Sequence, residues 1–82
     1  MKQLKIQEII SMQELHELGF EVVKSYIHDN YWTQRRRKGC ITIETTWTDE
    51  GDFESQDVQI DDGEWRVLQH REIVRLDEIL NK

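Results

Sequence analysis

The first feature of this sequence that could perform chemistry is a run of four cations: Arg35, Arg36, Arg37 and Lys38. Adjacent cations can bind phosphate groups, so the run is a candidate contact for nucleic acid. The chain as a whole opposes such a contact, because 17 acidic against 11 basic residues give a net charge of -6. In a β-strand, moreover, Arg35 and Arg37 would point to one face and Arg36 to the other. We therefore favour a charged hairpin end and keep nucleic-acid binding as the alternative.

The acidic residues are concentrated between Gly39 and Trp65, a stretch that contains no lysine or arginine. Such a concentration creates a negative field that can steer a basic partner protein. Acids in turns also keep a small protein soluble without any partner, and this alternative stays open. The candidate partner-binding edge consists of six of these acids: Glu44, Asp49, Glu50, Asp52, Glu54 and Asp57.

The histidines, the cysteine and the acids match no catalytic or metal-binding pattern. His16, His28 and His70 are far apart in the sequence, and segment 49–57 lacks the ligand spacing of a calcium loop. Cys40 is the only cysteine, which excludes an internal disulfide and suits a reducing compartment. We interpret it as a half-buried strand residue, since no pattern supplies an activating base. We expect no enzyme activity, no metal and no cofactor.

The length of 82 residues predicts one domain over residues 1–82. Hydrophobic residues make up 37% and charged residues 34%, as in a folded domain. No apolar run approaches the roughly 20 residues that span a bilayer, and the N-terminus lacks the features of a signal peptide. We therefore expect a cytoplasmic protein without membrane contact, and the oligomeric state stays open.

The elements that must position these residues begin with a short helix. Ser11 and Glu14 have the spacing of a capping box, and Gly19 can supply the left-handed residue that ends a helix, so we predict a helix at about 11–18. The apolar residues before it fit no regular period and predict a short strand or an irregular segment: Leu4, Ile6, Ile9 and Ile10.

Five stretches rich in β-branched and aromatic residues follow, over residues 20–28, 31–37, 40–48, 53–61 and 64–69, with turn residues between them. The last segment, 71–82, has apolar residues at helical spacing that can cover one face of a sheet: Ile73, Val74, Leu76, Ile79 and Leu80. The predicted fold class is α+β: an antiparallel β-meander of four to five strands, with a short N-terminal helix and a C-terminal helix packed mainly on one face.

The lengths of the loops predict which residues lie opposite one another. A two-residue loop at 62–63 pairs Ile60 with Trp65 and Val58 with Val67. A four-residue loop at 49–52 pairs Ile41 with Ile60 and Ile43 with Val58, and a loop at 38–39 pairs Trp32 with Thr45. Together these loops send one apolar set to the same face: Trp32, Ile41, Ile43, Trp47, Val58, Ile60, Trp65 and Val67.

The opposite face is predicted to be mostly polar, with Thr33, Arg35, Arg37, Thr42, Glu44, Thr46, Ser55, Asp57, Gln59 and Arg66. A tight turn at 29–30 also places Ile27 beside Trp32 and directs Val22 away from the core. Leu68 is predicted to point outward from its own strand. Either the first helix covers this second apolar set or it is a partner-binding patch, whose candidate residues are Phe20, Tyr26, Tyr31 and Phe53.

The order of these elements resembles the short proteins carried by bacterial phages and mobile elements. The resemblance covers most of the chain and comprises the helix end L18-G-F20, the strand I41-T-I-E-T45, the acidic turn and the helix end from Leu76 to Leu80. It implies a genetic context and no reaction. Small acidic phage proteins include inhibitors of host defence nucleases, some of which mimic nucleic acid. The basic run 35–38 departs from this pattern, because a pure mimic of nucleic acid is not expected to display adjacent positive charges.

These observations together predict a small, acidic, non-catalytic binding protein that acts by protein–protein interaction. The resemblance implies that it is encoded by a phage or mobile element, for instance as an inhibitor of a host or defence protein. The acidic edge and the apolar patch would form its docking surface. The alternative is an accessory protein that binds nucleic acid through the cationic run, together with Arg66.

Overall fold

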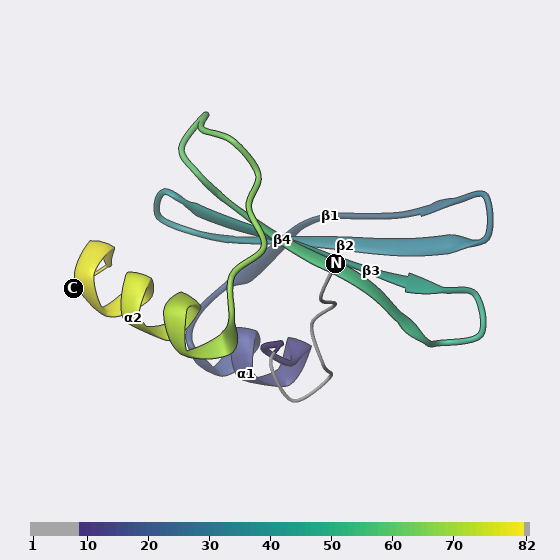
Figure 1. Cartoon of the computed structure of the whole chain (residues 1–82), viewed down its shortest axis with the longest axis horizontal. Coiled ribbons are helices and arrows are strands. Elements are labelled where there is room, and N and C mark those ends of the chain that lie inside the picture. The colour runs from purple at the N-terminus through teal and green to yellow at the C-terminus, as the bar shows by residue number, and fades with distance from the viewer. Residues whose placement is uncertain (1–8, 82) are drawn as a thin grey trace.

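A four-stranded antiparallel sheet with one helix before it and one after it forms the fold (Figure 1). The computed structural model describes residues 9–81. Its elements are α1 (Met12–Glu17), β1 (Glu21–His28), β2 (Tyr31–Lys38), β3 (Ile41–Thr48), β4 (Phe53–Ile60) and α2 (His70–Leu80). The strands lie in the sheet in their chain order, so the predicted α+β meander is confirmed, with four strands.

Helix α1 begins at the predicted local signal, and α2 begins at a similar one that was not identified from the sequence. The Glu14 backbone N–H donates to Ser11 Oγ over 3.1 Å and so caps α1, which ends before Gly19 at a φ of 97°. The Gln69 backbone N–H donates to the Glu72 side chain over 2.9 Å at the start of α2. Before α1, residues 9 and 10 adopt no regular element, while Leu4 and Ile6 lie outside the described residues.

The pairing of β3 with β4 follows the predicted register. Ile41 lies opposite Ile60 and Ile43 lies opposite Val58, so all four side chains point to the face that the helices cover. On the other face the predicted polar residues line up across β2, β3 and β4, in rows such as Arg35, Glu44 and Asp57. The predicted register of β3 and β4 therefore holds from Ile41 to Thr46, whereas a shift of one residue beside the turn places Phe53 opposite Trp47.

The pairing of β2 with β3 differs from the prediction by two residues. The turn is formed by Gly39 and Cys40, so Lys38 lies opposite Ile41 and Trp32 opposite Trp47, instead of opposite Thr45. A shift of two residues keeps every side chain on its predicted face, because the pleat repeats every second residue. Cys40 is half-buried as expected, but it lies in a turn and not in a strand.

The predicted fifth strand is reduced to a single bridge, between Val58 and Arg66. Asp61 adopts a left-handed φ of 51°, so the turn starts one residue earlier than the loop 62–63 implies. A shift of one residue reverses the faces. The predictions for Trp65 and Val67 as core residues were therefore wrong, and Arg66 lies on the helix side instead of the polar side.

The core lies between the two helices and one end of the sheet. Its fully buried apolar residues are Ile10, Leu15, Phe20, Ile41, Ile43, Val58 and Ile73. Three side chains that were expected to point away from the core do not: Phe20 is buried, Leu68 packs against the core, and Val22 lies opposite Arg36 on the helix side. At the end of α2, Ile79 and Leu80 are exposed, so the buried stripe of this helix is shorter than predicted.

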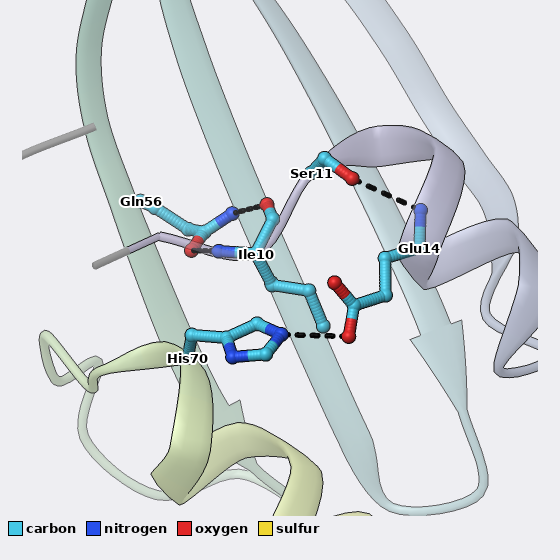
Figure 2. A network of polar contacts seen from close by, with 5 residues as sticks. All are labelled: Ile10, Ser11, Glu14, Gln56 and His70. Carbon is cyan, nitrogen blue, oxygen red and sulfur yellow. Dashed lines mark hydrogen bonds and ion pairs between the residues drawn. The ribbon is translucent and has the colours of Figure 1, made fainter. Parts of the chain in front are cut away.

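The side chain of Gln56 joins β4 to the segment that leads into α1 (Figure 2). Its Oε1 accepts from the Ile10 backbone N–H over 3.1 Å, and its Nε2 donates to the Ile10 carbonyl over 2.9 Å. Nε2 also donates to Thr45 Oγ1 over 3.1 Å. Because Gln56 is buried, its amide satisfies a backbone N–H and a carbonyl that no water reaches.

Replacing this amide by a hydrocarbon of similar size should destabilise the protein strongly. Gln56→Leu leaves both backbone groups of Ile10 without partners, which should cost about 2–4 kcal/mol of unfolding free energy, measured by urea denaturation. Gln59→Leu is the matched control, since Gln59 is a partly buried amide on the same strand that donates to the Gly63 carbonyl. Equal losses in the two variants would contradict this role of Gln56.

Candidate partner-binding surface

The cationic run is divided between the two faces of the sheet, and its members bond within the molecule. Lys38 Nζ lies 2.8 Å from Asp77 Oδ1 on α2, and Arg36 Nη1 donates to the Phe20 carbonyl over 2.9 Å. Both contacts join β2 to segments on the helix side of the sheet. Lys38 and Arg36 therefore position α2 and the start of β1, which reduces their availability to an external anion.

The other two cations lie on the polar face, as the strand alternation predicted. Arg35 Nε donates to Glu44 Oε2 over 2.9 Å, and its guanidinium lies 5.3 Å from the ring centroid of Trp65. Arg37 Nε donates to the Gly39 carbonyl over 3.0 Å and its side chain is exposed. The four cations thus form neither a single patch nor a set of unpaired charges.

The ion pair between Lys38 and Asp77 should contribute measurably to stability. Asp77 is almost fully buried, so Asp77→Asn should lower the unfolding free energy by about 1.5–3 kcal/mol, as for other hydrogen bonds to charged groups. Glu78→Gln on the exposed side of the same helix serves as the control and should change it by no more than about 0.5 kcal/mol. Thermal unfolding at neutral pH tests the difference. Similar values for both variants would show that the ion pair between Lys38 and Asp77 does not stabilise the fold.

Two of the six candidate acids lie halfway along their strands on the polar face, away from the turn that carries most of the others. Glu44 and Asp57 are directly opposite each other on β3 and β4. Arg35 neutralises Glu44, whereas burial, with the Glu44 carboxylate as the second cause, raises the pKa of Asp57 above its ordinary value of 3.8. These two acids are part of the sheet surface, and they do not contribute to an acidic edge.

The raised pKa of Asp57 has a consequence for stability. The folded state binds the proton of this carboxyl more tightly than the unfolded state does. The contribution of Asp57 to stability is therefore greatest below pH 3.8 and is lost as the pH rises through the raised pKa. Asp57→Asn should consequently stabilise the protein by about 0.2–1 kcal/mol at pH 7 and by less at pH 3.

Urea unfolding of the wild type and of Asp57→Asn at the two pH values measures this difference. Glu54→Gln, an exposed acid on the same strand, is the control and should show no gain that grows with pH. The explanation fails if the Asp57→Asn difference is the same at both pH values.

The remaining four candidate acids gather at one end of the sheet: Asp49, Glu50, Asp52 and Glu54. All four are exposed. The Asp49 backbone N–H donates to the Asn30 carbonyl over 2.8 Å, which joins the turn between β3 and β4 to the turn between β1 and β2. This second turn adds the exposed Asp29. We call these five acids the acidic rim.

Four apolar residues form a row across all four strands beside the acidic rim. Their order is Ile27, Trp32, Trp47 and Phe53, and we call them the aromatic row. The rings of Trp32 and Trp47 stack with centroids 4.6 Å apart, and Trp32 Nε1 donates to Ser25 Oγ over 3.0 Å. Ile27 is 80% exposed and Trp32 is 39% exposed, so much of the row faces solvent.

The aromatic row lies on the face that carries the helices, but at the end of the sheet that they do not reach (Figure 1). An eight-residue strand spans about 27 Å, whereas the 11 residues of α2 span about 16 Å and the six of α1 about 9 Å. The two helices pack against the other end, next to the turn between β2 and β3. This difference in length leaves the row uncovered by the described residues.

The structure divides the predicted apolar patch among three environments. Phe20 is buried in the core, so its assignment to an exposed patch was wrong. Tyr26 and Tyr31 lie on the polar face of β1 and β2, while Phe53 belongs to the aromatic row because of a register shift next to Trp47. The exposed members of the row, Ile27 and Trp32, were predicted to be core residues. The sequence did contain a signal for their exposure: the predicted helices are too short to cover the whole length of the strands.

A comparison of the chain with protein-family models, curated proteins and solved structures finds no match. Among residues 9–81, no helix is long and apolar enough to cross a membrane.

Proposed function

We propose that this protein is a non-catalytic binding protein that docks on another protein through the aromatic row and the acidic rim. The observation that carries the proposal is the partly exposed stack of Trp32 on Trp47, bordered by five exposed carboxylates. Tryptophan is enriched among residues that dominate binding energy in protein interfaces. A preformed stack also loses little side-chain freedom on binding.

The chemistry of this surface specifies the partner. A complementary protein would place an aliphatic or aromatic side chain on Ile27 and Trp32 and surround it with lysines or arginines. The carboxylates of the acidic rim accelerate such an encounter, and the effect weakens with salt. The resemblance to small phage and mobile-element proteins supports a host or defence protein as the target, which this protein would inhibit by occupying its surface. The single Cys40 suits a cytoplasmic location.

Binding of nucleic acid is the less supported function. A surface for single strands needs exposed aromatic rings next to available cations. The exposed rings of the aromatic row have carboxylates as neighbours, and three cations of the run bond to Glu44, Asp77 or the Phe20 carbonyl. We therefore expect a basic, apolar peptide to bind more strongly than a single-stranded oligonucleotide.

A titration followed by NMR amide shifts tests the proposal with a defined probe, a synthetic peptide of alternating lysines and leucines with a central tryptophan. We expect shifts at residues 27–32 and 47–54, and binding that weakens as salt is added. Trp32→Ser should reduce the affinity at least about tenfold, as expected for a central aromatic contact. Val67→Ser is the control, because Val67 is 58% exposed and lies outside the aromatic row.

A second variant separates charge from apolar contact. Asp49→Asn combined with Glu50→Gln and Asp52→Asn should remove most of the salt dependence and leave the positions of the shifts unchanged. Three results would refute the proposal: equal peptide affinity of Trp32→Ser and Val67→Ser, stronger shifts with a single-stranded oligonucleotide than with the peptide, or self-association that Trp32→Ser abolishes. The last result would make a second copy of this chain the occupant.

A further inference from the structure

A groove lies between β4, the segment 61–69 and α2, at the end of the sheet opposite the aromatic row. Its volume is about 620 Å³, within the range of sites that bind small molecules. Four aliphatic side chains line it: Val58, Ile60, Leu68 and Leu76. None of the described residues that line the groove is aromatic. This lining is suited to a flexible hydrocarbon chain more than to a flat ring.

Three arginines line the same groove: Arg66, Arg71 and Arg75. Arg71 and Arg75 are four residues apart on α2 and so lie on the same side of that helix. The backbone of Arg66 is held by two hydrogen bonds to Val58, which fixes the position from which its side chain starts. Two separate elements therefore bring cations to one apolar groove.

These guanidinium groups differ from those of the cationic run. Within residues 9–81, none of the three forms an ion pair or a side-chain hydrogen bond, whereas Arg35, Arg36 and Arg37 all do. The run thus serves the fold, while the arginines of the groove retain their donors for an external anion. Guanidinium groups pair with carboxylates through two parallel hydrogen bonds.

Two acids also line the groove and restrict the charge of its ligand. Glu64 and Glu72 contribute two negative charges against the three positive ones, which leaves a balance of one positive charge. Glu72 already accepts from the Gln69 backbone N–H, so it is held at the start of α2. A ligand with one negative charge neutralises this balance, whereas a dianion such as a phosphate monoester leaves one excess negative charge beside the two acids.

We propose that the groove binds a medium-chain alkyl carboxylate, with its carboxylate on the guanidinium groups and its chain on the aliphatic floor. This site is independent of the partner-binding surface at the opposite end of the sheet. The class of ligand follows from three observations together: an aliphatic floor, guanidinium groups without internal acceptors, and a single surplus positive charge.

Titration of the full chain with decanoate, below its micelle concentration, tests the proposal by NMR amide shifts. We expect shifts at residues 64–76 and none at the aromatic row. Decanol, which has the same chain without the charge, should bind about tenfold more weakly, and acetate, which has only the head group, should produce no shifts at equal concentration. Decyl phosphate should bind more weakly than decanoate.

The variants Arg71→Gln and Arg75→Gln should each weaken decanoate binding about tenfold, because each removes a charge-assisted hydrogen bond. Both residues are exposed, so the spectra of the free variants should show an intact fold. Arg37→Gln, an exposed arginine outside the groove, is the matched control and should bind decanoate like the wild type. Any of the following overturns the assignment: decanol binding as tightly as decanoate, decyl phosphate binding more tightly, an equal loss in Arg37→Gln, or no shifts at all with decanoate.

Discussion

The packing of Ile41 and Ile43 beneath the two helices is the interaction on which the rest of the structure depends. Both side chains are fully buried, and they belong to β3, which pairs with a strand on each side. Because side chains alternate along a strand, their burial fixes the face of every other residue in β3 and, through the register, in β2 and β4. The polar rows, the stacked tryptophans and the division of the cationic run all follow from this one choice of face.

The helices that cover these isoleucines are short, and polar contacts supplement their apolar packing. Gln56 holds the segment before α1, Lys38 holds α2 through Asp77, and Glu14 on α1 contacts His70 on α2 at 2.6 Å (Figure 2). Each contact joins segments that are far apart in the sequence. From the sequence alone, the cationic run is a candidate contact for nucleic acid. In the structure, its residues serve largely to hold the fold together.

The sequence was sufficient to predict the parts of the fold that short-range rules determine. Local spacing alone was enough to predict the capped helix α1 and the alternation of Arg35, Arg36 and Arg37. It was also enough for the register of β3 and β4 from Ile41 to Thr46. The sequence was insufficient where a single backbone angle determined which face of the sheet the following residues lie on. The left-handed conformation of Asp61 shifted the following segment by one residue and moved Trp65 to the polar face, where it covers Arg35. The burial of Phe20 likewise depended on tertiary packing, which no local pattern reports.

The candidate surface was predicted only in part, because one of its components is local and the other depends on tertiary packing. The acidic turn 49–52 is a local feature, but the exposure of Ile27 and Trp32 depends on how far the helices extend along the sheet. An exposed tryptophan stack on neighbouring strands invites association between copies. The acidic rim opposes that association, since two copies would bring like charges together, and the same charges attract a basic protein. In the proposed function, the acids and the aromatic row would therefore act as one selective surface, in which the apolar contact supplies affinity and the charges determine which partner can approach.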